Sequence, residues 1–278
     1  MKRILIIAGM HRSGTSVIAQ WLYRSGLHLG KKLLEADIGN KDGHFEDTDF
    51  VFLHEYILRQ HRLSGSGLTD QLMSELTTAE IKALEKLVAE KKELKNEWGW
   101  KDPRTCLFLS AYRQLIPEAV YLVVIRDFRS VVSSLIDRDY KHTIRKIRSG
   151  NIFRKLFPPD KNGQLKKDYY EKYSEYYLKV WISYNKYLLA HIALLPESSF
   201  ILVSTEFVLK HDQQIIAQLK RKWGFTLEYI SFSEVFKKDL VNQHVMIDSF
   251  IKDSSLINEA NQINHRLKDL LLFPAVIS

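Results

Sequence analysis

Hydrophobic residues in this chain form short continuous runs, separated by longer segments with helical spacing. Three runs rich in β-branched residues, Ile4 to Ala8, Val120 to Ile125 and Phe200 to Val203, are typical of strands buried on both faces of a parallel sheet. Apolar residues at helical spacing predict helices over Thr78 to Lys95 and Tyr169 to Leu195. Strands that alternate with helices predict an α/β fold with a central parallel sheet flanked by helices.

Composition limits the class of protein without choosing its function. The chain has 278 residues, 45% of them hydrophobic, which suits one α/β domain or a domain with an inserted lid. Its net charge of +8 favours an anionic ligand or surface, but nucleotides, nucleic acids and acidic lipids all meet that condition. Cys106 is the single cysteine, so an intrachain disulfide is excluded and a reducing compartment is expected.

The start of the chain, MKRILIIAGMHRSG, resembles a signal peptide only superficially. Its apolar run is too short and stops at His11 and Arg12 without a small-residue cleavage site. Elsewhere no segment approaches the ~20 apolar residues of a membrane span. We therefore expect a soluble, cytoplasmic protein. The histidines form no metal-binding string and one cysteine makes no zinc site of the thiolate kind, so we expect no metal.

A basic segment over about residues 138–172 interrupts the alternation of strands and helices. Glycine and proline break it at four positions, Gly150, Pro158, Pro159 and Gly163. Two interpretations remain open: a solvated basic insertion, and a lid that attracts an anionic acceptor. The basic residues are Lys141, His142, Arg145, Lys146, Arg148, Arg154, Lys155, Lys161, Lys166 and Lys167.

The string GMHRSGTS, residues 9–16, follows the first strand and leads into a helix. Gly9 and Gly14 have the spacing of the ATP-binding loop G-x-x-x-x-G-K-[ST], but Thr15 stands where the lysine belongs. The strong cation is Arg12, two residues before the second glycine. Backbone N–H groups of such a turn, the positive end of the next helix and nearby hydroxyls form an anion site. Without the lysine, a Mg²⁺-dependent triphosphate reaction is disfavoured.

Three strings in order, HRSGTS, WKDPR and VVIRDFRSVVSSL, resemble the sulfotransferases that use 3′-phosphoadenosine 5′-phosphosulfate (PAPS). The similarity is greatest to the bacterial carbohydrate-type and tyrosylprotein-type branches. It extends from residue 1 to about Leu135 and returns weakly at WISYNKYLLAH and ILVSTEFVL. The resemblance implies a single sulfotransferase domain over residues 1–278, with a three-layer fold like that of P-loop NTPases.

The resemblance assigns the first loop to the 5′-phosphosulfate of the donor. Arg12 takes the place of the family's loop cation, which stabilises the charge that develops on the departing phosphate. The donor-binding residues that it implies in this loop are Gly9, His11, Arg12, Ser13, Gly14, Thr15 and Ser16.

The third string provides residues for the other end of the donor. By resemblance, Arg126 and Ser134 hold the 3′-phosphate, because a dianionic ester needs a fixed cation and a hydroxyl donor. Arg129 and Ser133 are weaker candidates, and Asp127 is interpreted as a helix cap. No C-terminal R-K-G phosphate motif is present, so part of this site is unassigned, with Arg145, Arg148 or Lys222 as substitutes.

The string EWGWKDPRTCLF contributes a second cation. Pro103 restricts Asp102 to an extended or turn conformation, which directs Lys101 or Arg104 toward a cleft at a strand end. By resemblance, Lys101 stabilises the transferring sulfonate. We interpret Trp98 and Trp100 as core residues, and Asp102 with Arg104 as a local ion pair.

Transfer to a hydroxyl or an amine requires a general base. Acidic residues cluster in NKDGHFEDTDF, which resembles a GyFE segment whose acidic residue lies near the acceptor, and we assign the base to Glu46. His44 and His54 are reserve candidates. Asp47 and Thr48 precede a helix expected over Phe50 to Leu58 and suit a cap. The catalytic K-x-H string of the cytosolic phenol and steroid branch is absent.

These features together predict a metal-independent sulfotransferase. It would move the sulfonate group in line from PAPS to a hydroxyl on a carbohydrate, a glycolipid or another biomolecule, releasing 3′,5′-phosphoadenosine (PAP). An atypical P-loop kinase is the alternative enzyme. A non-catalytic basic module that binds nucleic acid or acidic membrane is an alternative of another class.

Overall fold

All strands of the central sheet run in the same direction. The computed structural model describes residues 2–35, 43–71, 73–149, 163–236 and 246–271. Its sheet has the order β2-β1-β3-β4, and every pairing is parallel. The four strands are β1 Arg3–Ala8, β2 Glu97–Lys101, β3 Val120–Val124 and β4 Phe200–Val203.

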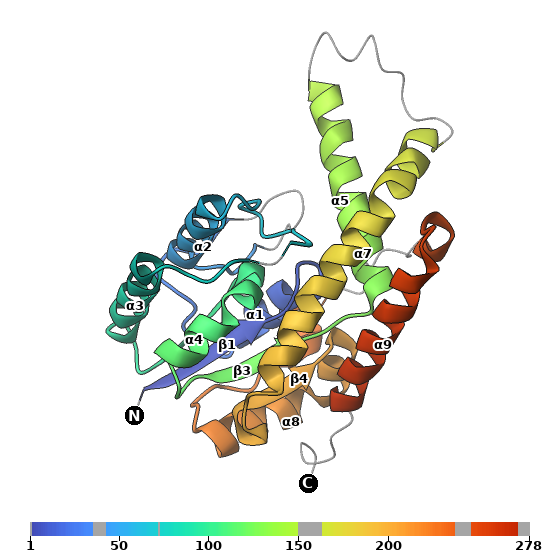
Figure 1. Ribbon diagram of the computed structural model, residues 1–278. Coiled ribbons are helices and arrows are strands. Elements are labelled where there is room, and N and C mark those ends of the chain that lie inside the picture. Colours follow the sequence, from blue (N-terminus) through green and yellow to red (C-terminus); the bar gives the residue numbers. More distant parts are fainter. Residues whose placement is uncertain (1, 36–42, 72, 150–162, 237–245, 272–278) are drawn as a thin grey trace.

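Helices cover both faces of the sheet, and each face has its own core (Figure 1). Side chains of β1 alternate between them: Ile4 and Ile6 enter one core, and Leu5 and Ile7 enter the other. The second core contains α1 Thr15–Arg24 and α8 Thr205–Trp223. The larger first core contains α2 Thr48–Gln60, α3 Thr78–Lys92, α4 Leu109–Leu115, α5 Phe128–Ser149, α7 Gln164–Ile192 and α9 Ser254–Leu271. The predicted three-layer α/β fold, like that of P-loop NTPases, is confirmed.

Local sequence signals explain where several elements begin and end. Thr77 and Glu80 form a reciprocal capping box at the start of α3, and Gly224 ends α8 in a left-handed conformation with a φ of 71°. Helices α3 and α7 each end about one turn before the pattern predicts. Strand β2 was not among the predicted strands, because its sequence EWGWK contains a glycine and no β-branched residue. Trp98 and Trp100 are core residues, as expected.

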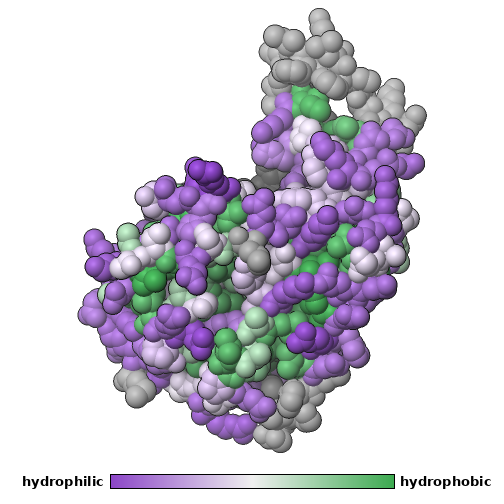
Figure 2. All heavy atoms as spheres, viewed as in Figure 1, coloured by the Kyte–Doolittle hydropathy of each residue, from purple (hydrophilic) through white to green (hydrophobic). Residues whose placement is uncertain are grey.

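Helices α5 and α7 pack along each other and project together beyond the sheet (Figure 1). Tyrosine rings line their contact: Tyr169 lies 5.9 Å from Tyr140 and 5.3 Å from Tyr173 between ring centroids. Hydrophilic side chains cover most of the visible face of these projecting ends (Figure 2). Residues 138–149 continue α5 and residues 164–172 begin α7, whereas residues 150–162 of the basic segment lie outside the described residues. Its role as a lid stays a prediction.

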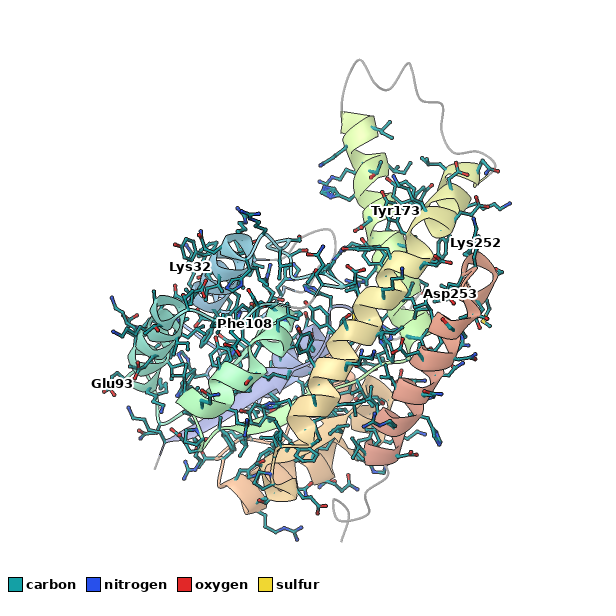
Figure 3. The ribbon with its side chains drawn as sticks, in the orientation of Figure 1. Lys32, Glu93, Phe108, Tyr173, Lys252 and Asp253 are labelled. Carbon is teal, nitrogen blue, oxygen red and sulfur yellow. The ribbon has the colours of Figure 1, made fainter. Side chains whose placement is uncertain are left out.

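The C-terminal helix is tied to these two helices near its start. Lys252 and Asp253 lie just before α9 (Figure 3), and their backbone N–H groups donate to the Glu175 carboxylate of α7 at 2.7 and 3.2 Å. Arg129 of α5 forms a bidentate pair with Asp248 of the short helix η5 Ile247–Phe250. These contacts hold the C-terminal part of the chain against the helix that carries the third motif.

The glycine of β2 provides a test of the sheet packing. A Cβ atom at Gly99 would lie 2.2 Å from the Leu5 carbonyl oxygen of β1, and backbone cannot move aside as a flexible side chain can. We expect Gly99→Ala to lower the free energy of unfolding by about 2 kcal/mol or more, measured by urea denaturation. Gly163→Ala is the matched control, because its Cβ meets open space and only its φ of 68° is unfavourable, at about 1 kcal/mol. Equal losses in both variants would contradict the steric argument.

Candidate active site

The loop between β1 and α1 requires glycine at two positions, for its backbone conformation at Gly14 and for close packing at Gly9. Gly14 has a φ of 98°, and its Cβ would lie 2.5 Å from the Thr205 methyl group. A Cβ at Gly9 would lie 2.5 Å from the Val124 carbonyl oxygen at the end of β3. Arg12 also has a positive φ, 66°, which is unfavourable for a residue with a side chain. The loop is therefore held tightly between the ends of β1 and β3 and the start of α8.

The polar groups of the loop have different roles. The Ser13 hydroxyl and backbone N–H both donate to the Met10 carbonyl, at 2.6 and 3.2 Å, so Ser13 shapes the turn. Thr15 is also buried. The first-turn N–H groups of α1, at Thr15, Ser16 and Val17, have no acceptor within the helix, as at any helix start. The anion-binding capacity of the loop therefore rests on backbone amides, Arg12 and the Ser16 hydroxyl.

Hydrogen bonds join the loop to the third motif. Arg126, at the end of β3, donates to the Arg12 carbonyl oxygen from Nη1 at 3.0 Å. Arg12 in turn donates from Nε to Ser134 Oγ at 2.9 Å. Burial lowers the pKa of Arg126, with Glu206 and Asp127 opposing that effect. The structure thus brings Arg12, predicted at the 5′-phosphosulfate, together with Arg126 and Ser134, predicted at the 3′-phosphate.

The second motif reaches the same loop through the sheet register. Lys101 pairs with Ile7 across β2 and β1, which places it beside the loop that follows β1. Its side chain is fully buried, and Nζ donates to Glu46 Oε1 at 2.6 Å and to Ser16 Oγ at 3.1 Å. A buried ammonium requires such partners, because isolated charge is costly away from water. Lys101 and Glu46, predicted separately, therefore form one ion pair at the edge of the loop.

Arg104 adds a cation to which the sequence analysis gave no role in transfer. Its Nη1 lies 3.9 Å from Glu46 Oε2 and donates to Asp102 Oδ1 at 3.0 Å. The local ion pair expected between Asp102 and Arg104 is confirmed. His54 lies beside this pair, fully buried, with Nδ1 2.7 Å from Asp102 Oδ2 and Nε2 2.6 Å from the Tyr112 hydroxyl. Both ring nitrogens of His54 are engaged, with Asp102 and with Tyr112, which argues against its reserve role as a base that touches the acceptor.

The other acidic residues near Glu46 have structural partners. Asp47 is the N-cap of α2 and accepts from the Asp49 backbone N–H at 3.0 Å, as predicted. Lys91 binds both carboxylates, at 2.5 and 2.6 Å. His44, the other reserve candidate, lies 4.0 Å from Glu46 Oε1. Asp42 lies outside the described residues.

Several weaker candidates lie apart from the loop. Arg129 pairs with Asp248, and the Ser133 hydroxyl donates to the Ser130 carbonyl of its own helix. Asp127 caps α5 through the Arg129 backbone N–H, as expected. Lys222 donates to the Glu197 carbonyl, before β4 and therefore at the opposite edge of the sheet, so its suggested contact with the 3′-phosphate is wrong. Arg145 is exposed on the projecting part of α5, and the Arg148 side chain lies outside the described residues.

Sequence reasoning also missed a short segment beside the loop. Three successive carbonyls accept from buried or part-buried side chains: Gly65 from Arg104 Nε at 2.7 Å, Ser66 from His11 Nε2 at 2.9 Å, and Gly67 from the Tyr184 hydroxyl at 2.7 Å. The signal in the sequence is the string SGSG, which has the composition of an exposed turn. Only the fold shows which side chains hold it.

The described residues contain no group of three or more histidine, cysteine, aspartate or glutamate side chains arranged to hold a metal ion. Among the helices of the same residues, none combines the length and apolar character needed to cross a membrane.

His11 should make stability depend on pH. Burial, the largest effect, and the nearby Arg104 and Arg138 together lower its pKa from 6.5 to about 3, so the folded protein keeps His11 neutral. The contribution of neutral His11 to the free energy of unfolding is complete above pH ~6.5. It is lost as the pH falls, because only the unfolded chain then takes up a proton on this residue. Below pH ~6.5, we expect His11 to lower the free energy of unfolding by about 1.4 kcal/mol for each pH unit.

Urea denaturation of His11→Gln at several pH values checks this expectation. The variant should lose stability less steeply between pH ~6.5 and ~5 than the original protein. His265→Gln, on the exposed side of α9, is the matched control and should leave the slope unchanged. Parallel slopes for the original protein and His11→Gln would refute the assignment.

Comparison with known proteins gives partial matches in sequence and a match in fold. A Caenorhabditis elegans protein with protein-tyrosine sulfotransferase in its name is 36% identical over 80 residues, 29% of this chain and 30% of that protein. A Caenorhabditis briggsae protein named in the same way is 32% identical over 76 residues, 27% of this chain and 26% of that protein. This chain therefore spans less than a third of the length of these curated relatives. No family model matches the chain.

The fold resembles that of a solved bacterial enzyme. A sulfotransferase from Alicyclobacillus acidocaldarius superposes with a TM-score of 0.51 at 13% identity, over 98% of this chain and 96% of that chain. At this identity the similarity concerns the fold. Together with the names of the two nematode relatives, it confirms the resemblance to the sulfotransferase family that the three motifs predicted.

Proposed function

We propose that this chain is a sulfotransferase with PAPS as donor and a hydroxyl group as acceptor. The observation that carries the proposal is the meeting of three motifs at one glycine loop. Lys101 donates to Ser16, Arg12 donates to Ser134, and Arg126 donates to the Arg12 carbonyl. The sulfotransferase fold and the names of the relatives support the same activity.

The described residues suit both anionic ends of this donor. For the 5′-phosphosulfate they offer the loop amides and Arg12. For the 3′-phosphate they offer Arg126 and Ser134 at the end of β3 and on α5. Ser134 Oγ accepts from Arg12 and so keeps its own hydrogen to donate to a phosphate oxygen. ATP lacks the group that this second pair would hold.

The transfer step exchanges one bond to sulfur for another. The acceptor oxygen bonds to sulfur while the bond between sulfur and the bridging phosphate oxygen breaks. The electron pair leaves with the phosphate, and Arg12 stabilises the new negative charge by hydrogen bonding without giving up a proton. The acceptor proton passes to Glu46, so the products are a sulfate ester and PAP.

Lys101 and Glu46 are placed to act together. An ammonium group has three N–H donors, and the contacts with Ser16 and Glu46 use two of them. We assign the third to an oxygen of the transferring sulfonate. Since Oε1 of Glu46 accepts from Lys101, we assign the acceptor proton to Oε2. With Arg12 and Lys101 supplying positive charge, we expect transfer without a metal.

For the acceptor we propose a hydroxyl of a carbohydrate or glycoconjugate. A tyrosine hydroxyl in a protein is the competing acceptor, because the two nematode relatives carry that residue in their names. Tyr170 is buried and donates to Asp137, so its ring is not available to stack on either acceptor. Incubation with labelled PAPS, oligosaccharides and tyrosine peptides would decide between the two classes.

Calorimetric titration with PAP tests the donor assignment. We expect metal-independent binding of PAP that is tighter than binding of ATP with Mg²⁺. Arg126→Ala should weaken PAP binding by about 10- to 100-fold, through loss of a charge-assisted contact with the 3′-phosphate. Arg24→Ala, at the exposed far end of α1, is the control. Tighter binding of ATP with Mg²⁺ would support the kinase alternative, and no binding of either nucleotide would support the basic module.

Turnover measurements test the base. Glu46→Gln keeps the shape of the side chain but cannot take up the acceptor proton, so we expect kcat to fall by about 10²- to 10⁴-fold with PAP affinity retained. Glu90→Gln, on the exposed side of α3, is the control. Similar losses of kcat in both variants would rule out a specific role for Glu46.

A further inference from the structure

The Arg104 guanidinium is held from several directions at once. Its Nε donates to the Gly65 carbonyl at 2.7 Å and its Nη1 donates to Asp102 Oδ1 at 3.0 Å. Glu55 and Glu46 lie on its remaining sides, at 3.7 and 3.9 Å. The side chain is 10% exposed, so these contacts fix its orientation in a site largely closed to water.

A buried relay fixes the carboxylate on which Arg104 rests. Asp102 directly follows β2, His54 is in α2 and Tyr112 is in α4. Each of the three residues is 0% exposed. His54 donates from Nδ1 to Asp102 Oδ2 at 2.7 Å, and its Nε2 lies 2.6 Å from the Tyr112 hydroxyl. Tyr112, His54 and Asp102 are therefore joined in one buried chain of hydrogen bonds.

Electrostatics keeps Asp102 ionised within this relay. Burial, the largest effect, raises its pKa, but Arg104 and His54 together outweigh burial and hold the pKa well below its usual range. The Arg104 backbone N–H also donates a hydrogen bond to Asp102 Oδ1 at 3.0 Å, which fixes the carboxylate relative to the backbone. Asp102 is thus a permanent anchor for the Arg104 side chain.

We propose that Arg104 is a positioning residue that orients the Glu46 carboxylate for proton transfer, and that Tyr112, His54 and Asp102 hold Arg104 in place. This inference rests on the proposed sulfotransferase activity. Lys101 binds Oε1 of Glu46 at 2.6 Å, and Arg104 lies beside Oε2 at 3.9 Å. At that distance Arg104 attracts the carboxylate without forming a hydrogen bond, so Oε2 keeps its lone pairs for the acceptor proton.

Lysine at position 104 would not reproduce this arrangement. The guanidinium is planar and donates in two fixed directions at once, to Gly65 and to Asp102, while it faces Glu46 with the same Nη1. A lysine ammonium is a single point at the end of a flexible chain. Charge alone is therefore insufficient, and the geometry of the group matters.

The test combines turnover, donor binding and chemical rescue. We expect Arg104→Ala to lower kcat by about 10- to 100-fold while the Kd for PAP changes less than about 2-fold, because the altered group is on the acceptor side. Arg104→Lys should be almost as impaired. Added guanidinium ion should restore part of kcat in Arg104→Ala and none in Arg104→Lys, whose side chain fills the space. His54→Gln should lower kcat in the same direction by a smaller factor.

Thermal melting of each variant separates positioning from folding. An unchanged kcat in Arg104→Ala would overturn the proposal. It would also be overturned if kcat, PAP affinity and melting temperature all fell in this variant and guanidinium ion did not restore kcat. Crystal structures of the original protein and Arg104→Ala provide a readout that does not need turnover: the Glu46 carboxylate should rotate in the variant. If Glu46 stays in place in Arg104→Ala, the positioning role is refuted. If Glu46 rotates in the variant but the original protein shows no turnover with PAPS, the proposed function is refuted instead.

Discussion

A buried lysine ammonium at the end of β2 is the constraint around which the site is arranged. Lys101 is fully buried, so its charge must be met by Glu46 and by the Ser16 hydroxyl. That requirement fixes three elements relative to one another: the end of β2, the start of α1 and the segment before α2. The positions of the candidate base and the candidate donor loop follow from the same ion pair.

The remainder of the site depends on where parallel strands end. Because β1, β2 and β3 run in one direction, the loop, Lys101 and Arg126 all lie at the carboxyl edge of the sheet. The tight approach of Gly9 and Gly14 to their neighbours keeps the loop from moving relative to that edge. Positive charge is thereby concentrated in one place while the two hydrophobic cores remain apolar.

Sequence patterns predicted the elements better than their contacts. Apolar runs located β1, β3 and β4, and helical spacing located α3 and α7, although both end before their predicted ends and α7 begins at Gln164 instead of Tyr169. The sequence pattern did not predict strand β2, because its residues are selected by packing. Gly99 permits close approach to β1, and the tryptophans of β2 fill the larger core. Local propensity does not report such tertiary requirements.

By itself, the sequence determined the glycine loop, the three motifs and their resemblance to sulfotransferases, since these depend on residues close together in the chain. Only the tertiary structure decided which of them meet. Arg12 and Ser134 are 122 residues apart, and Lys101 and Glu46 are 55 apart. The structure also reassigned His54 from a reserve base to a buried support of Asp102. Partners of a buried charge are chosen by three-dimensional proximity, which spacing along a single chain does not encode.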